Sequence, residues 1–580
     1  MLSLRGSAAM ALLVFLAGVP LASADTKTLT TAADFLAGRL TNVQVRPDGD
    51  GAVALAPVAT PGGWQLGTAL PSPVSFHAAA YYAGHVYSIG GRQGSSSDFV
   101  PDVFVSTLDA NGMPGPWGAT TPLPSGRAFH SAVAYAGYLY VIGGDKPGFV
   151  VTPEVWYAPI KADGQLGDWK SASPLPVDAG RDLAGVAAAY GRLYVVAGAS
   201  NDAFAGNSTV FSADVKPDGS LTQWQEDRDL PDEAARLGAP AIFSYDHLYV
   251  VGGDAPSLNA DVPLNTVWSA LVQPDQKLGD WGSTTEMTVP LVDSGGNVVG
   301  SRPEPRYYDW NSGVAAGGNL ILVGGHAIPD GAQEASPVSS VLVGSLNADG
   351  SVASWAFSPN PYPFTVSRTA AVVANDRIIV LGGRDSNGDD HSEVYVAPLV
   401  PATPAAVAAN GLYESPIIDL GQTSNISSIQ WETSGTATMT LRARVADESG
   451  TWSAWTAEDA NHNSSIQKSG RYVQFAVKLT SDGQKTGALT AVTINYGAAP
   501  TVVYGDLTGD GVVNISDALA ALRISLQLDT PTLAQLEAGD VAPKPGRGPK
   551  AGQPFGDGVI NILDVGRILR AALHLETQFP

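Results

Sequence analysis

Short apolar runs that end in a glycine pair recur along the first 400 residues, and they predict short β-strands that end in tight turns. Five copies end in Gly-Gly, at Gly91, Gly144, Gly253, Gly325 and Gly383, and a sixth, RLYVVAG, ends at Gly198 with Ala197 in place of the first glycine. The first positions of these pairs are 53, 54, 55, 72 and 58 residues apart. Apolar runs of this length bounded by turn residues are typical of strands. A period of roughly 50 residues indicates a repeat architecture built from small sheets.

Six tryptophans follow the same period, at Trp64, Trp117, Trp169, Trp224, Trp281 and Trp355, each shortly before a turn that contains proline. A large aromatic side chain of this kind can fill the wedge between twisted sheets. The glycine pairs and tryptophans resemble the kelch repeat, in which one strand ends in Gly-Gly and a later strand carries a tryptophan. The resemblance covers about residues 60–400 and implies a mainly β protein with a kelch-type β-propeller.

The phase of the repeat predicts how the propeller closes. Trp64 precedes the first glycine pair with no strand before it, and the last copy, which contains Tyr395, has no tryptophan-bearing strand after it. We therefore expect the segment around Trp64 to supply the outer strand of the last blade, which gives six blades and leaves no open sheet edge.

The segments that flank the repeats predict a second β domain. Residues 25–59 contain two or three alternating strands, and residues 405–498 contain further strands such as TMTLRARV and RYVQFAVKL, in the pattern of a β-sandwich. Since the entry and exit of the propeller should be neighbours, we expect 25–59 to join 405–498 in one sandwich. The alternative is an extended N-terminal arm that lies on the propeller.

The C-terminal segment YGDLTGDGVVNISDALAALRISL has oxygen-bearing residues at the spacing of a calcium loop. A Ca²⁺ ion needs six to eight oxygen ligands, which one short loop can supply before a helix begins. The candidate ligands of this first loop are Asp506, Thr508, Asp510, Val512 through its carbonyl, Asn514 through water, and Asp517. The candidate ligands of a second copy, GDGVINILDVGRILRAAL, are Asp540, Asp557, Val559, Asn561 and Asp564.

The two loops, each followed by one helix, resemble the type I dockerin, a small α-helical calcium-binding domain (a pair of F-hands), over residues 502–576. The second copy departs from that pattern, because residues 540–564 form a loop of about twice the usual length. The resemblance implies Ca²⁺ as cofactor and a cohesin-like protein as partner. The partner-binding positions that it implies at the helix starts are Ile515, Ser516, Arg523, Ile562, Leu563 and Arg570. An ion that serves only to fold a small domain is the alternative.

The N-terminal segment predicts export from the cell, and the composition excludes several functions. Residues 1–24 have Arg5, an apolar run and small residues before Asp25, which predicts a signal peptide cleaved near Ala24 and a secreted protein without a membrane span. The chain has no cysteine, which excludes thiolate chemistry and Cys-ligated metals. A net charge of −23 argues against nucleic acid as a partner.

An arginine follows the proline turn in five copies, at Arg127, Arg181, Arg236, Arg306 and Arg368. Two interpretations remain open. These arginines either form hydrogen bonds between blades, as repeat residues commonly do, or they form a ring that attracts acidic sugars at one end of the central channel.

The fifth copy carries the longest insertion, between Trp281 and Gly324, and it contains Tyr307 and Trp310. Long insertions on a rigid scaffold often carry function, so these two residues join the candidate ligand site, with a tolerated surface insertion as the alternative.

No catalytic constellation is evident. The combination of propeller and sandwich is similar to galactose oxidase, whose cofactor needs a cysteine that this chain lacks, and the hairpin turns lack the pattern of sialidases. We therefore expect a non-catalytic binding or adhesion protein linked to extracellular polysaccharide. A polysaccharide-active hydrolase or lyase with its site on the propeller face is the alternative.

Overall fold

The computed structural model divides into two compact units, residues 1–497 and 498–580. The described residues are 25–46, 51–94, 99–176, 180–200, 206–255, 262–292, 297–307, 310–328, 334–401, 406–498, 504–508, 512–531, 533–542 and 559–575. The expected signal peptide lies outside them.

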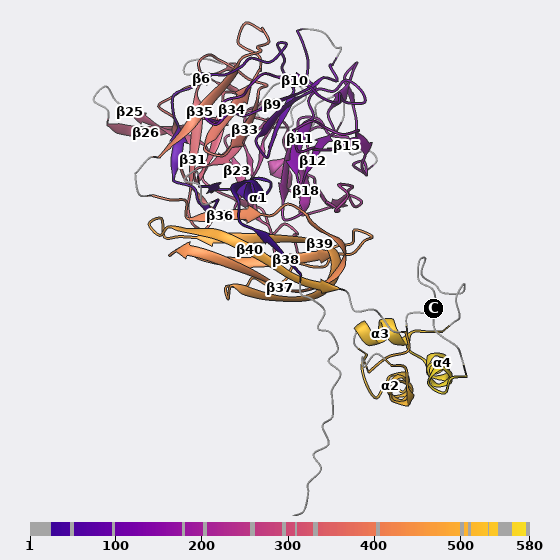
Figure 1. Cartoon of the computed structure of the whole chain (residues 1–580). Coiled ribbons are helices and arrows are strands. Elements are labelled where there is room, and N and C mark those ends of the chain that lie inside the picture. The colour runs from indigo at the N-terminus through magenta and orange to yellow at the C-terminus, as the bar shows by residue number, and fades with distance from the viewer. Residues whose placement is uncertain are drawn as a thin grey trace, which may run out of the picture. The chain divides into compact units, whose positions relative to one another are not determined.

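The first unit contains a propeller of six antiparallel blades (Figure 1). The first three blades are β7 (Ala78–Tyr82), β8 (His85–Ile89), β9 (Val103–Thr107) and β10 (Gly118–Ala119); β11 (Ser131–Tyr135), β12 (Tyr138–Ile142), β15 (Val155–Pro159) and β16 (Lys170–Ser171); and β17 (Gly185–Ala189), β18 (Arg192–Val196), β19 (Val210–Asp214) and β20 (Gln225–Glu226). The next two are β21 (Ala241–Ser244), β22 (His247–Val251), β23 (Val267–Leu271) and β24 (Gly282–Ser283); and β27 (Gly313–Ala316), β28 (Asn319–Val323), β31 (Val341–Leu346) and β32 (Val352–Phe357).

The sixth blade joins the two ends of the propeller. It consists of β33 (Ala370–Ala374), β34 (Arg377–Leu381) and β35 (Val394–Pro401), and β35 pairs with β5 (Ala59–Pro61) and β6 (Gln65–Leu66) from the N-terminal side. Tyr395 lies opposite Leu66, two residues beyond Trp64. Six blades and the closure expected from the repeat phase are therefore confirmed.

The six repeat tryptophans tie each blade to its neighbour. Every indole Nε1–H donates to a backbone carbonyl of the adjacent blade over 2.7–3.2 Å. The pairs are Trp64 with Asn360, Trp117 with Thr68, Trp169 with Thr121, Trp224 with Ser173, Trp281 with Arg228, and Trp355 with Thr285. Trp64 forms the same kind of hydrogen bond as the other five tryptophans, so the first and last blades are joined in the same way as every other pair of neighbours.

The glycine pairs make the second set of contacts between blades. In each copy the N–H of the last glycine donates to a carbonyl just before the next blade, over 2.5–3.0 Å. The acceptors for Gly91, Gly144, Gly198, Gly253, Gly325 and Gly383 are Arg127, Arg181, Arg236, Arg306, Val366 and Val74. The need for glycine is clearest at Gly143, which has φ +61° and where a Cβ would lie 2.1 Å from the carbonyl oxygen of Arg181.

Besides the blades, the described part of the propeller contains three two-stranded ribbons and one 3₁₀ turn. The ribbons are β13 (Asp145–Lys146) with β14 (Val150–Val151), β25 (Thr288–Val292) with β26 (Val298–Pro303), and β29 (His326–Ala327) with β30 (Ser336–Pro337), and the turn is η1 (Asp232–Ala234). The ribbon β25–β26 comes from the long insertion and projects from the propeller in Figure 1.

A nine-stranded sheet combines both ends of the first unit. It contains β1 (Asp25–Leu29), β2 (Arg39–Thr41), β3 (Val43–Val45), β4 (Val53–Leu55), β36 (Asn410–Glu414), β37 (Ile418–Gly435), β38 (Thr438–Ala446), β39 (Asn463–Thr480) and β40 (Gly487–Ala498). β1 pairs with β40 from Asp25 opposite Tyr496, and β2 pairs with β36. The short helix α1 (Ala32–Leu36) buries Phe35 against Tyr413, with the centres of the two rings 5.4 Å apart. The propeller is thus inserted between strands of one sheet.

A buried polar network fastens the sheet to the propeller. The Glu414 carboxylate, 1% exposed, accepts hydrogen bonds from the Tyr135 hydroxyl (2.8 Å) and the Tyr190 backbone N–H (2.5 Å). Gln474 of β39 donates to the same hydroxyl and accepts from the Arg444 guanidinium at 2.7 Å. Because buried polar groups need partners, this network fixes the orientation of sheet and propeller.

The described residues of the second unit include three helices, α2 (Ile515–Ser525), α3 (Leu533–Gly539) and α4 (Ile562–Ala572). Asn514 caps α2 and Asn561 caps α4, each in a capping box with the aspartate three residues later, Asp517 or Asp564. A small apolar core that includes Ala521 and Ile568 packs α2 against α4. The two helices are thus built on the same local plan.

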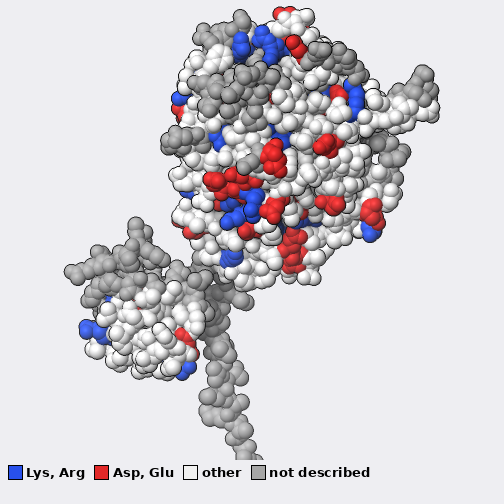
Figure 2. Space-filling view, turned by 180° about the vertical axis from the view of Figure 1, so that it is seen from behind, with Lys and Arg blue, Asp and Glu red and all other residues white. Residues whose placement is uncertain are grey.

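On the face shown in Figure 2, acidic and basic side chains are scattered between large areas of uncharged surface. Among the described helices, none has the length and apolarity needed to cross a membrane.

Candidate functional site

Four of the five candidate arginines are buried structural residues. Arg127, Arg181, Arg236 and Arg306 are 0–4% exposed. Arg127 donates to the Gly143 carbonyl at 2.7 Å and pairs with Glu154 at 2.7 Å. The guanidinium group of Arg127 thus bonds to acceptors of its own blade and stabilises that blade from inside.

The other three buried arginines follow the same plan. Arg236 donates to the Gly252 carbonyl at 2.7 Å, Arg181 donates to the Thr209 hydroxyl, and Arg306 pairs with Glu304 at 2.7 Å. Burial lowers the pKa of Arg181 and of Arg236 to about 10. These four side chains are buried and bond within their own blades, so they form neither an exposed ring that could attract acidic sugars nor hydrogen bonds between blades.

Arg368 occupies a different place from the other four. The hydrogen bond from Gly325 shows that Val366 takes the position of Arg127 in the sixth blade. Arg368 lies two residues later, where the earlier blades carry Phe76, Phe129, Leu183 and Gly238. All five residues have positive φ, between 50° and 62°.

These positive-φ residues are joined in series by backbone hydrogen bonds across five neighbouring blades. The Phe76 N–H donates to the Arg368 carbonyl, Phe129 to Phe76, Leu183 to Phe129, and Gly238 to Leu183, over 2.9–3.1 Å. Three of the side chains belong to one apolar cluster. We call this ring, Phe76, Phe129, Leu183, Gly238 and Arg368, the axial ring.

The two aromatic candidates in the fifth blade are also buried. Tyr307 is 2% exposed and Trp310 is 5% exposed. The Trp310 indole donates to the His130 carbonyl at 3.1 Å and lies 6.3 Å from the Phe76 ring. Their prediction as ligand residues is therefore not supported, because both side chains pack inside the propeller.

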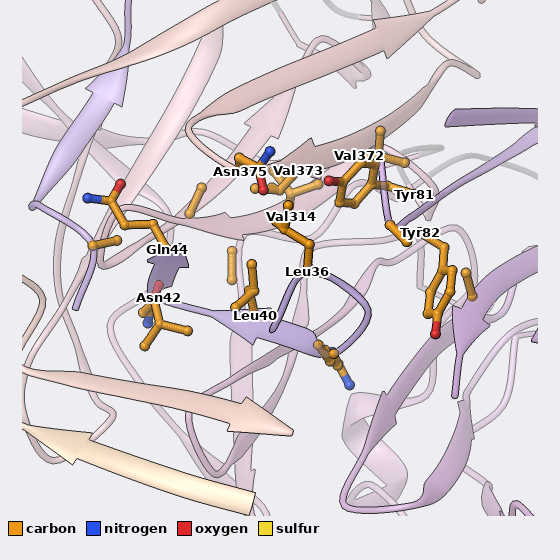
Figure 3. A pocket seen from close by; sticks show the side chains of 18 of the residues that line it. Leu36, Leu40, Asn42, Gln44, Tyr81, Tyr82, Val314, Val372, Val373 and Asn375 are labelled. Carbon is orange, nitrogen blue, oxygen red and sulfur yellow. The ribbon is translucent and has the colours of Figure 1, made fainter. Parts of the chain in front are cut away.

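A cavity of about 290 Å³ lies at the other end of the channel, next to the sheet. The first strands of four blades line it with small residues, among them Ala80, Ala134 and Ala371, and residues 36–44 line the opposite side. Figure 3 shows Leu36 and Leu40 of that segment across from Val314 and Val372. The alanine-rich first strands leave this space because their side chains are too short to meet across the axis.

The cavity wall also holds several polar groups. Tyr82 donates to the Ala37 carbonyl at 2.8 Å, and Asn42 donates to the Ser244 hydroxyl at 2.9 Å. Burial raises the pKa of Tyr82 to about 12 and also raises that of Tyr81. The phenols are therefore neutral at physiological pH and act as hydrogen-bonding groups rather than as bases.

In the second unit, the first predicted calcium loop brings together oxygen atoms around Asp517. Asp517 is fully buried and Asp506 is 8% exposed. The Thr508 hydroxyl donates to Asp517 at 2.8 Å and to Asp506 at 3.3 Å. Three of the predicted ligands therefore lie together, while Asp510 lies outside the described residues.

The second loop repeats the arrangement around Asp564. Asp564 is fully buried, and its carboxylate accepts from the backbone N–H groups of Val541 and Ala542 at 2.7 and 2.6 Å. Burial, with a contribution from the neighbouring Asp540, raises the pKa of Asp564. Asp557 lies outside the described residues.

The two asparagines among the predicted ligands have a further task. Asn514 Oδ1 accepts from the Ser516 N–H at 2.7 Å, and Asn561 Oδ1 accepts from the Leu563 N–H at 2.8 Å. Val512 and Val559, whose carbonyls the sequence assigns to the ion, are 61% and 56% exposed.

The predicted partner-binding residues lie on the surface of α2 and α4. Ile515, Ile562 and Leu563 are 62–64% exposed. Ser516, Arg523 and Arg570 are exposed as well. Exposed apolar side chains that lie together on a surface can mark a site of interaction.

No family model matches this chain. Beta-scruin of Limulus polyphemus is 26% identical over 234 residues, which cover 39% of this chain and 24% of that protein. Kelch-like protein 40 of Mus musculus is 28% identical over 207 residues, or 34% of this chain and 30% of the relative. The chain thus spans less than a third of the length of these relatives.

Among solved structures, that of YjhT matches with a TM-score of 0.43 and 16% identity, over 57% of this chain and 95% of that one. The repeat residues, the six blades and the similarity to kelch-repeat proteins together support a kelch-type β-propeller.

Proposed function

We propose that this protein is a secreted, non-catalytic binding protein whose propeller holds an extracellular polysaccharide and whose C-terminal unit is a dockerin-like calcium module. The observation that carries the binding role is the kelch-type propeller, a rigid scaffold whose repeat arginines and aromatics brace the fold from inside. In this proposal residues 1–24 direct export, and the nine-stranded sheet folds around its core as a β-sandwich.

The residues of the second unit fit a hard cation. Asp506, Thr508 and Asp517 present oxygen atoms at one place, and Asp540 and Asp564 do so at another. Buried carboxylates near each other oppose folding unless a positive charge compensates them. A bound Ca²⁺ would supply that charge and hold each loop against the start of its helix.

We further propose that the exposed apolar helix starts of this module dock to a cohesin-like protein. Ile515 and Ile562 occupy equivalent positions at the starts of α2 and α4, and both are about two-thirds exposed. An apolar surface of this kind favours a protein partner.

Asp517→Ala tests the calcium part of the proposal. In the mature protein, calcium titration should show weaker binding by about tenfold or more, because a fully buried ligand carboxylate is removed. Asp529→Ala is the matched control, since Asp529 is an exposed carboxylate of the same unit that pairs with Arg523. Unchanged calcium heat in Asp517→Ala would refute the assignment.

A glycan panel screened with the mature protein tests the propeller. Retention of polysaccharide without cleavage is expected. Cleavage of a retained glycan would favour the alternative of a hydrolase or lyase, and retention of none would refute a polysaccharide ligand.

A further inference from the structure

The cavity of about 290 Å³ lies where the propeller meets the sheet, and the proposed function assigns no ligand to it. Its wall consists of the first strands of four blades, β7, β11, β27 and β33, and of residues 36–44 with a few neighbours. Small-molecule pockets begin at about this volume, roughly 300 Å³. Asp376, whose side chain is 61% exposed, belongs to the wall, so the cavity reaches the surface. We call this space the channel cavity.

The first strands turn unpaired backbone edges toward the channel cavity. In the described part of the chain, each of the four pairs with one strand only, on its outer side. A two-residue turn joins β7 to β8, so Tyr82 and His85 form the closing hydrogen-bonded pair and the bonds alternate from there. The backbone N–H and C=O groups of Ala79 and Tyr81 therefore point away from β8, toward the axis. The equivalent residues of β11, β27 and β33 are Ala134, Ala315 and Val373.

Small side chains keep these edges accessible. Ala79, Ala134 and Ala315 are partly exposed, although they lie at the centre of the ring. A strand edge without a partner strand needs hydrogen bonds from another source. Backbone donors and acceptors from four blades therefore surround one accessible space.

The rest of the wall supplies a hydroxyl group and an apolar surface. Tyr81 Oη is buried, and no described group bonds to it with ordinary geometry, although Asn375 lies nearby. On the other side of the cavity, Leu36 and Leu40 present apolar side chains across from Val372 (Figure 3). One side of the cavity is thus polar and the other apolar.

The two charged residues of the wall each lie near an opposite charge. The Arg39 guanidinium is 3.9 Å from the Glu414 carboxylate, and the Asp376 carboxylate is 3.8 Å from the Arg377 guanidinium. A charged ligand would therefore lack a counter-charge of its own in the cavity, and burying an unpaired charge is costly. These surroundings favour a neutral ligand.

We propose that the channel cavity binds a single neutral ring that carries several hydroxyl groups, such as a free monosaccharide or a cyclitol. Hydroxyl groups around the ring both donate and accept, so they match the N–H and C=O groups of the strand edges. The C–H face of the ring packs against Leu36 and Leu40. An apolar ligand of the same size would leave the strand edges and the Tyr81 hydroxyl without partners. The inference goes beyond the proposed function, which concerns a polymer.

Saturation-transfer NMR of the mature protein with glucose and with myo-inositol tests the proposal. We expect at least one of them to bind. Ala134→Leu should lower its affinity at least tenfold, because the larger side chain takes up space in the cavity. Tyr81→Phe, which keeps the ring and removes the hydroxyl, should lower it about three- to tenfold.

Ala119→Leu is the matched control and should leave the affinity unchanged, because Ala119 is an exposed residue of β10. Thermal unfolding checks that each variant is folded. If Ala134→Leu does not fold, Tyr81→Phe decides.

Three outcomes would overturn the inference. The first is no saturation transfer to either ring, which would mean that water alone fills the cavity. The second is wild-type affinity in either folded cavity variant. The third is preference for cyclohexanol over both probes, which would show that the apolar wall dominates. Retention of polysaccharide is measured separately on the glycan panel, with polymers too large for the cavity, so either proposal can fail without the other.

Discussion

Glu414→Ala should destabilise the whole first unit, because Glu414 connects the sheet to two blades of the propeller. The carboxylate accepts from Tyr135 in the second blade and from the Tyr190 N–H next to the third, and it is 1% exposed. Alanine would leave both donors buried without an acceptor. Burial, together with the charge of Glu414, also raises the pKa of Tyr135, so the phenol stays a donor.

The loss in the free energy of unfolding follows from the number of buried donors that are left without an acceptor. Each buried donor left unpaired costs about 1–3 kcal/mol, and removing one partner of a buried charged network costs about 3–5 kcal/mol. We expect the free energy of unfolding to fall by about 4 kcal/mol. With an unfolding entropy of about 2.1 cal/mol/K per residue over about 470 residues, this lowers the Tm by about 4 °C.

Calorimetric unfolding of the mature protein is the assay. Tyr135→Phe should lose about 1–2 kcal/mol, and the double variant should lose less than the sum, since both changes break one hydrogen bond. Glu432→Ala is the control, because Glu432 is an exposed residue of β37 in the same sheet. A Tm of Glu414→Ala within 1 °C of wild type would refute the reasoning.

Three further predictions concern the propeller. Gly143→Ala should lower the free energy of unfolding by more than about 2 kcal/mol, because its Cβ would meet a carbonyl oxygen at 2.1 Å, whereas Gly148→Ala, with open space around it, should lose only about 1 kcal/mol; denaturant titration compares them. Arg127→Met should cost about 2–4 kcal/mol by the same measurement, and a neutral result would contradict its bracing role. Burial lowers the pKa of His77 and His130 from 6.5 to about 3, so the unfolded chain takes up protons that the folded chain does not. The Tm should fall between pH 6.5 and 3, and His77→Gln should reduce that slope; an equal slope would count against this origin.

The residues that recur in every copy predicted the propeller correctly. The glycine pairs and tryptophans make backbone contacts that any blade needs, so their spacing carries the blade number and even the pairing of Leu66 with Tyr395. Local sequence was sufficient because each contact joins neighbouring repeats.

The candidate ligand residues were harder to predict. Val366, and not Arg368, is the residue that matches Arg127, but the proline turn alone does not show this. Val366 and Arg368 are two residues apart, so the alternation of side chains along a strand does not distinguish them. Arg92 and Arg384 follow the glycine pairs of the first and last copies, a pattern that is visible in the sequence. Closure of the ring makes these two copies neighbours, and only the three-dimensional arrangement brings their side chains together.

Burial was the other quantity that the sequence did not reveal. Tyr307 and Trp310 lie in an insertion, which favours a surface position, yet both are buried. The environment of Trp310 depends on Phe76 and His130, which are far away in the chain, and Tyr307 lies beside His326.

The pairing of β1 with β40 has a consequence for biosynthesis. Asp25 meets Tyr496, so the first strand to leave the ribosome has to wait for the last strand of its sheet. At about 5–20 residues per second this wait is roughly 25–95 seconds. Meanwhile β6 also lacks its partner in the sixth blade. The propeller cannot close until translation has passed about residue 400, and the sheet cannot be completed until it has passed about residue 490. The N-terminal strands must therefore remain unaggregated for most of the time that the chain takes to be made.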